Sequence, residues 1–176
     1  MKRSLAAGIV VVVAVCFVLP ARAPDDLIAV NSRKTAADFT LSDSKGASIK
    51  LSDYRGRVVL LDFWGTFCEV CATEIPWFSE FQNKYKGSGL SVIGVSLDDS
   101  WKPVKPYLEE KKVNYTVVIG TDDLARRFGV VNALPGTLLI DRDGKIADLH
   151  LGMVNKEAFE GEIQTLLKDG TKKTVH

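Results

Sequence analysis

The sequence predicts an α/β domain with a central mixed β-sheet flanked by helices. Segments with the continuous apolar pattern of buried strands alternate with segments of helical spacing through the middle of the chain. The chain then ends in a strand, a turn, a second strand and a helix, which adds antiparallel neighbours to the sheet. A length of 176 residues with 46% hydrophobic content is enough for one such core and a short additional segment.

The N-terminal segment differs from the rest of the chain. A basic start is followed by an uncharged apolar run over residues 5–19 and by an A-x-A pattern at residues 21–23, which is typical of a secretory signal. Pro24 disfavours cleavage directly before it, so residues 1–23 are either a cleaved signal peptide or a retained membrane anchor. The apolar run is shorter than the roughly 20 residues of a full span. Both alternatives place the remainder outside the cytoplasm.

The expected organisation follows from this segment. The predicted parts are a signal or anchor over residues 1–23, a polar linker over 24–36, the α/β domain over 37–170 and a tail over 171–176.

The first half of the domain contains a hairpin, a buried strand and a helix. Residues 37–41 and 49–51 flank a turn-rich stretch and predict the N-terminal β-hairpin. Residues 58–64 form a nearly unbroken apolar run, which is typical of a central strand covered on both faces. Helical spacing then begins at Cys71 and continues to Tyr85, with a kink expected at Pro76.

The second half alternates between the two kinds of element. The apolar patterns predict a strand at 90–96, a helix at 101–112 beginning near Pro103, a strand at 116–119, a helix at 122–128, strands at 137–141 and 146–151, and a helix at 156–168. A turn at residues 142–145 joins the last two strands into a hairpin. Asn155 is expected to cap the closing helix.

The charge of the domain argues against nucleic-acid binding. Without residues 1–23 the chain has 20 basic and 22 acidic residues, a net charge of −2. It has no basic stripe of the kind that binds nucleic acid. Contact with a membrane is therefore expected through the N-terminal segment only.

The cysteines carry the main chemical signal. Cys16 lies in the apolar leader, so the exported domain contains only Cys68 and Cys71. A domain of this size does not need a disulfide to build its core. A C-x-x-C bridge also closes too small a loop to constrain the unfolded chain much. The pair is therefore predicted to be catalytic.

The position of the pair favours thiol–disulfide exchange. It follows a buried strand and opens a helix, whose free N–H groups and dipole stabilise a thiolate. The spacing puts both sulfur atoms on one helical face. Cys68 is expected to attack a substrate disulfide, and Cys71 to resolve the mixed disulfide.

Three other readings of the pair remain. A zinc site would need two more ligands, for which the sequence offers only His150 and His176. A haem attachment site would need a histidine where Ala72 stands. A structural disulfide is the third alternative. We expect neither a metal nor a cofactor.

The segment from residue 61 to 71, LDFWGTFCEVC, resembles the active site of thioredoxins. It is more similar still to the exported, often membrane-anchored reductases of the TlpA/ResA type. The resemblance extends from Ala37 to Lys168 and includes Pro76 and Leu134-Pro135. It implies a thioredoxin-like fold with an N-terminal hairpin and an extra helix inserted before the half that carries a cis-proline. It also implies dithiol–disulfide exchange without a bound cofactor.

The resemblance assigns roles to further residues. Pro135 would be the cis-proline facing the cysteines, and the backbone of Leu134 would pair with an extended substrate; the alternative is a proline that ends a loop. Independently of the resemblance, Trp64 and Phe67 are expected at the substrate-binding site, where packing around the site is favoured over a direct role.

Two carboxyl groups are candidates for proton transfer. The resemblance places Asp62 beneath the second cysteine as a proton acceptor, and burial would raise its pKa toward neutrality. It places Glu74 beside the cysteines. The alternatives are an outward-facing residue for Asp62 and a solvated charge in the first helical turn for Glu74.

Three positions depart from the family pattern. Phe67 stands where tryptophan is usual, Val70 where proline is usual, and Gly136 where threonine or serine is common. These changes leave the reaction class intact, but they leave the reduction potential and the substrate choice open.

The sequence therefore predicts an extracytoplasmic thiol–disulfide oxidoreductase, in the periplasm or on the outer face of the cytoplasmic membrane. The expected partners are an exported protein disulfide, with apocytochrome c as one candidate, and a membrane thiol electron donor. The alternatives are a thiol peroxidase of the peroxiredoxin type and a non-enzymatic copper-handling thiol module.

Overall fold

A computed structural model describes residues 27–132 and 134–169 of the chain. The predicted leader and tail, and the first three residues of the predicted linker, lie outside the described residues. Within the described ranges, no helix is long and apolar enough to cross a membrane.

The core is a five-stranded mixed sheet in the order β5-β4-β3-β6-β7. Its strands are β3 (Val58–Trp64), β4 (Leu90–Ser96), β5 (Thr116–Ile119), β6 (Gly136–Ile140) and β7 (Ile146–Leu151). β4 is parallel to both β3 and β5, whereas β6 is antiparallel to β3 and to β7. All seven residues of β3 are buried, as expected for a strand covered on both faces. The predicted mixed sheet is confirmed.

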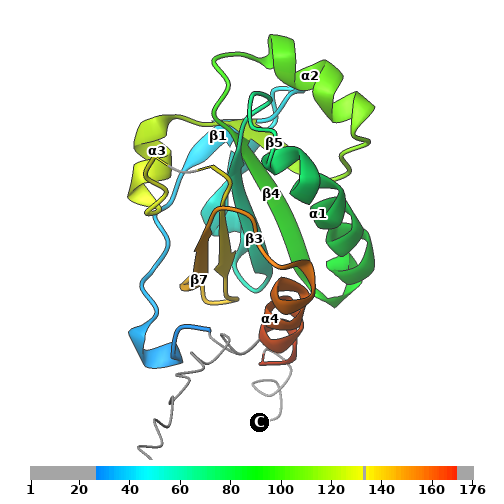
Figure 1. Cartoon of the computed structure of the whole chain (residues 1–176). Coiled ribbons are helices and arrows are strands. Elements are labelled where there is room, and N and C mark those ends of the chain that lie inside the picture. The colour runs from blue at the N-terminus through cyan, green and yellow to red at the C-terminus, as the bar shows by residue number, and fades with distance from the viewer. Residues whose placement is uncertain (1–26, 133, 170–176) are drawn as a thin grey trace, which may run out of the picture.

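Helices and a hairpin cover the two faces of this sheet (Figure 1). α1 (Cys71–Tyr85) and α4 (Lys156–Asp169) pack on one face, against Leu60 of β3 and its neighbours. The short helix α3 (Asp122–Arg127) and the hairpin of β1 (Thr40–Ser42) and β2 (Ser48–Lys50) pack on the other. Because side chains alternate along a strand, successive residues of β3 enter opposite cores.

The features implied by the family resemblance are present. β1 and β2 form the N-terminal hairpin as a separate antiparallel pair. α2 (Trp101–Glu110) is the inserted helix, and it connects β4 to β5 along the chain. The Leu134–Pro135 peptide bond is cis. Three short 3₁₀ turns complete the described elements, at Val30–Ser32, Leu51–Tyr54 and Lys86–Ser88.

One helix start differs from the expectation, and one cap is confirmed. α2 begins at Trp101 and not near Pro103, because the Ser100 side chain accepts a hydrogen bond from the Lys102 amide and caps the helix. Pro103 falls in the first turn, where a backbone N–H would have no intrahelical acceptor, so the N–H that proline lacks is not missed. Asn155 caps α4 as predicted, accepting the Ala158 amide at 2.9 Å.

Candidate active site

The dithiol lies at the junction between β3 and α1. Cys68 is in the connecting loop and Cys71 is the first residue of the helix, and the two are joined in a disulfide. Cys68 is partly exposed, whereas Cys71 is 1% exposed. The Cys71 amide donates to Cys68 Sγ at 3.2 Å. In the reduced protein this N–H would stabilise a Cys68 thiolate. Cys68 is therefore the sulfur that a substrate can reach.

Asp98 anchors the loop that precedes the dithiol. Its carboxylate accepts the backbone N–H of Thr66 at 2.9 Å and the Thr66 hydroxyl at 2.5 Å. The Ser96 hydroxyl donates to the same carboxylate at 2.7 Å. These bonds tie the loop to the end of β4. Asp98 was not predicted as a site residue, although an acid two residues after the apolar run of a buried strand is a signal that could have been used.

The cis-proline loop lies beside the dithiol. Leu134 packs against the same small core that contains Cys71 and Trp64, and Cys68 packs there too. The amide of Gly152, just beyond β7, donates to the Pro135 carbonyl at 2.8 Å. Pro135 itself is buried. Leu134, the residue before the cis-proline, therefore packs in the same core as the two cysteines.

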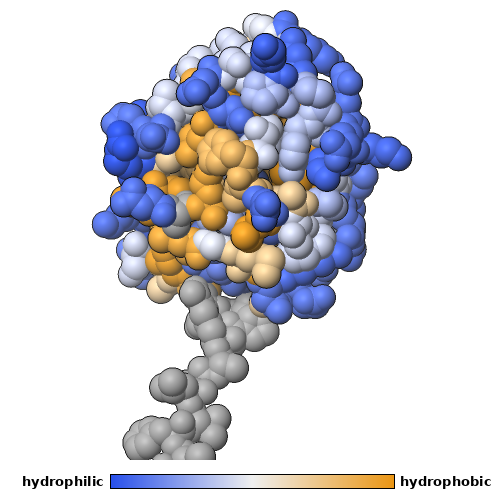
Figure 2. Space-filling view, turned by 45° about the horizontal axis from the view of Figure 1, so that its top comes forward, coloured by the Kyte–Doolittle hydropathy of each residue, from blue (hydrophilic) through white to orange (hydrophobic). Residues whose placement is uncertain are grey.

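Apolar side chains gather on the outer surface of this region. Phe67 is 67% exposed, and it lines a groove of about 550 Å³ together with Leu134, Leu97 and Val130. Polar side chains also line the groove, namely Asp99, Asp122, Arg126 and Asn132. Figure 2, in which the top of the molecule is turned forward, shows an apolar area in the middle of the face with hydrophilic residues around it. The structure thus brings Phe67 and Leu134 together.

Trp64 packs beneath the dithiol and has no exposed surface. It is fully buried, and its ring lies 5.3 Å from the ring of Tyr107. The alternation of β3 turns Trp64 inward beneath α1, into the core that contains Cys71. It packs under the dithiol, and its burial does not support contact with a substrate.

Asp62 is a buried carboxyl group on the α1 side of β3. It is 1% exposed, and the Thr137 hydroxyl donates to its Oδ1 at 3.3 Å. Burial raises the pKa of Asp62 well above its ordinary value, and the charge of Glu74 raises it further; the bond from Thr137 acts in the opposite direction. The outward-facing alternative is therefore wrong.

Glu74 is also inside the protein, one turn into α1. It is fully buried, and its Oε1 accepts the Val154 amide at 2.6 Å. Burial raises the pKa of Glu74 to about 7, against the lowering effects of the Val154 amide and of His150. The solvated-charge alternative is wrong here too. A group with a pKa near neutrality can both take up and release protons at physiological pH.

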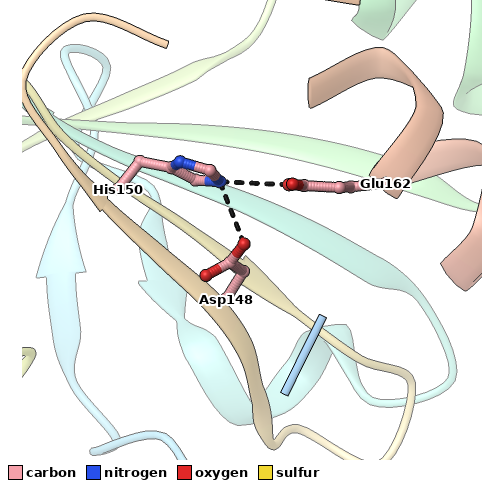
Figure 3. Close-up of side chains that lie close together, drawn as sticks. All are labelled: Asp148, His150 and Glu162. Atoms are coloured by element: carbon pink, nitrogen blue, oxygen red, sulfur yellow. Dashed lines mark hydrogen bonds and ion pairs between the residues drawn. The ribbon is translucent and has the colours of Figure 1, made fainter. Parts of the chain in front are cut away.

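A further charged group lies beyond these two residues, and the sequence analysis did not assign it a role. His150 of β7 points at two acids, with Nε2 3.1 Å from Asp148 Oδ2 and 3.0 Å from Glu162 Oε2 (Figure 3). Among the described residues, Asp148, His150 and Glu162 form a group whose potential ligand atoms all lie within 4.8 Å of one another, which is close enough to hold a metal ion. The imidazole lies between the two carboxylates, which is the geometry of an ion pair. A D-x-H pattern on an edge strand was the available signal.

These observations define a class of protein. A thioredoxin-like sheet, a C-x-x-C disulfide at the start of a helix and a facing cis-proline are the parts of a thiol–disulfide oxidoreductase.

The comparisons with known proteins give the family. The model of the AhpC/TSA family matches residues 33–149. A thiol-disulfide oxidoreductase ResA of Geobacillus kaustophilus is 35% identical over 139 residues, which cover 79% of each chain. The ResA protein of Bacillus subtilis is 32% identical over 141 residues, covering 80% of this chain and 78% of the relative. The chain belongs to the AhpC/TSA family, and its activity is that of a ResA-type thiol–disulfide oxidoreductase.

Solved structures agree with this assignment. The thioredoxin domain of a thiol-disulfide oxidoreductase from Bacteroides vulgatus is 30% identical and superposes with a TM-score of 0.66, covering 77% of this chain and 95% of that one. A secreted thiol-disulfide isomerase from Corynebacterium glutamicum superposes with a TM-score of 0.74 over 85% of this chain and 98% of that one. At 20% identity, the second likeness concerns the fold alone.

Proposed function

We propose that this oxidoreductase works outside the cytoplasm as a reductase of protein disulfides. The observation that carries the direction is the modest stabilisation available to a Cys68 thiolate. A neutral amide donates to its sulfur, and the adjacent residue is the exposed acid Glu69. Strong oxidants owe their potential to a very stable thiolate, so a weakly stabilised one favours the disulfide form and a reducing potential.

The reaction follows from the two cysteines. The Cys68 thiolate attacks one sulfur of the substrate disulfide; a mixed disulfide forms, and the other substrate sulfur leaves as a thiolate that takes up a proton. The Cys71 thiol then passes its proton to the Asp62–Glu74 pair and attacks Cys68 Sγ. This step forms the Cys68–Cys71 disulfide and releases the second substrate sulfur as a thiolate, which takes up a proton to give the thiol. One substrate disulfide is reduced for each dithiol oxidised.

The surface around Cys68 favours an extended substrate segment. Leu134 and the exposed Phe67 line a groove of mixed polar and apolar character, which would accept the residues next to the substrate cysteine. An exported protein with an exposed disulfide fits this description. The family resemblance supports apocytochrome c as a candidate, with electrons supplied by a membrane thiol carrier.

The reduction potential tests the proposed direction. Equilibration of the purified domain with glutathione is expected to give a potential nearer about −270 mV than about −120 mV. A value above about −170 mV would contradict the reductase direction while leaving thiol–disulfide exchange intact. The same preparation is assayed for hydroperoxide consumption and for bound copper, neither of which is expected.

Export is tested with a fusion. An enzyme that is active only in the cytoplasm is joined to the C-terminus of the full chain, and the fusion is expected to be inactive because residues 1–23 direct export. A matched fusion that begins at residue 37 is expected to be active. Equal activity of the two fusions would overturn the location.

A further inference from the structure

A row of polar residues crosses the sheet beneath α1 and α4. Asp62 of β3 pairs directly with Thr137 of β6, and Thr137 pairs directly with His150 of β7. Residues directly opposite on neighbouring strands point to the same face of a sheet. Neighbouring strands are about 4.8 Å apart, so His150 lies about 10 Å from Asp62 along this row. The face is the one that α1 and α4 cover.

The geometry around His150 favours a charged imidazole. Asp148 and Glu162 hold its Nε2 from two elements, β7 and α4, and their side chains are 5% and 4% exposed (Figure 3). The ring of Phe159 packs edge-on against the imidazole at 5.2 Å. Burial lowers the pKa of His150, but the hydrogen bonds to Asp148 and Glu162 outweigh it and raise the pKa to about 9.

Glu74 is connected to this group through the contacts of neighbouring residues. Its carboxylate accepts the amide of Val154, only four residues after His150. Phe78, one turn after Glu74 in α1, packs against Phe159 at 6.0 Å, and Phe159 in turn packs against His150. Glu74 is thus three residues after Cys71 in α1 and is bonded to the segment that follows His150. The charge of His150 lowers the pKa of Glu74, and the charge of Glu74 raises the pKa of Asp62.

We propose that His150 is a positioning residue for the exchange reaction: its imidazolium, held by Asp148 and Glu162, favours the ionised form of Glu74, so that the Asp62–Glu74 pair can accept the proton of Cys71. Two neighbouring carboxyl groups would otherwise both hold a proton in this apolar setting, and neither could take another. The inference rests on the proton-accepting role proposed above for that pair.

The titratable groups that face this region come from four helices and strands and from one loop. Asp148 comes from β7, Glu162 from α4, Glu74 from α1 and Asp62 from β3, while Tyr115 faces Asp62 from the segment before β5. All of these groups are acids, and His150 is the member of the set that becomes positive on protonation.

The test follows the titration of Glu74 directly. Carboxyl ¹³C shifts of the oxidised protein are recorded against pH, with a chelator present, for the wild type and His150→Gln. The Glu74 midpoint is expected to rise by about half a unit to one unit in His150→Gln, because an opposite charge has been removed. His150→Lys, which restores a cation between the two acids, should return the midpoint toward the wild-type value. The rate of mixed-disulfide resolution, measured against pH, should fall on the acid side with a midpoint that shifts in the same direction as the Glu74 midpoint.

Phe159→Leu provides the matched structural control. It loosens the packing around the imidazole while keeping its charge, so it should lower the denaturation midpoint and leave the Glu74 midpoint in place. An unmoved Glu74 midpoint in His150→Gln, or an equal shift in Phe159→Leu, would overturn the inference alone. Resolution at the wild-type rate in Glu74→Gln would instead overturn the proton role on which the inference rests.

Discussion

At the scale of single residues, the chemistry of this protein depends on which polar groups the fold keeps from water. Cys68 meets solvent and Cys71 does not, although they are three residues apart, because the helix begins between them. Asp62 and Glu74 are buried, and the hydrogen bonds described above join them to Thr137 and to the Val154 amide, which are neutral groups. Burial therefore sets their proton affinity: it raises the pKa of Asp62 well above its ordinary value and that of Glu74 to about 7.

Asp62→Asn tests the role of the buried carboxyl group. Asparagine cannot take or pass on a proton, so resolution of the mixed disulfide should slow by about 100-fold, whereas the first attack by Cys68 should change little. Rapid-quench measurement of the two steps with a disulfide-containing peptide separates them. Wild-type rates for both steps would show that Asp62 is only structural.

The same variant makes a prediction about stability. The folded pKa of Asp62 is raised above its unfolded value, so its contribution to stability is greatest in acid and is lost as the pH rises through the folded pKa. Asparagine is neutral at every pH. Urea denaturation should therefore show that Asp62→Asn gains stability relative to the wild type between pH 4 and pH 8. A constant difference across that range would contradict the buried, protonated carboxyl group.

At the scale of elements, the join between the cis-proline and β6 depends on a small residue. Gly136 opens β6 in an ordinary backbone conformation, so it is not needed for a left-handed turn. An added Cβ would come within 2.5 Å of Val130 Cγ1. Val130 follows α3 and lines the groove, so the glycine lets this segment approach the sheet closely. The glycine that departs from the family pattern thus has a packing reason.

Gly136→Ala is expected to destabilise the fold by about 1–3 kcal/mol, because the extra methyl group overpacks against Val130. Val130→Ala should relieve the clash, so the double variant should be less destabilised than the sum of the two single changes. Urea denaturation of the four proteins measures this coupling. Additive losses would show that the two side chains do not compete for the same space.

The regular elements could be predicted from the sequence to a large extent. The bounds of β3 and β4 match the apolar runs because both strands are buried over their whole length. The start of α2 was displaced because a serine cap outweighed the proline signal. Cys68, Cys71 and Pro135 could be placed because their motifs are local and specific.

The remainder of the site depends on contacts between distant parts of the chain. His150 meets Glu162 only when β7 pairs with β6 and α4 folds back onto the sheet. Asp98 meets Thr66 because β4 lies beside β3 in register. Trp64 is buried because it lies on the face of β3 that α1 covers. The spacing of residues along the sequence does not predict these contacts, because they depend on how strands pair and helices pack.

At the scale of the whole molecule, the active site is assembled where several connections meet at one end of the sheet (Figure 1). The loop after β3 carries the dithiol, the segment after α3 carries the cis-proline, and the segment after β7 is bonded to it through Gly152. Outward, these connections present apolar surface to a substrate. Inward, they meet the polar row of Asp62, Thr137 and His150. In the proposed mechanism, the disulfide thus has a substrate-binding side and a proton-accepting side.

The measurement that tests this account most directly is the trapping of a mixed disulfide. Reduced Cys71→Ala is mixed with a peptide that contains a disulfide, and the products are resolved by mass spectrometry. Cys71→Ala is expected to accumulate the peptide on Cys68, and Cys68→Ala is expected to accumulate none. The wild type is expected to release the reduced peptide. A stable adduct on Cys71 in Cys68→Ala, with none on Cys68 in Cys71→Ala, would contradict the assignment of Cys68 as the attacking thiol.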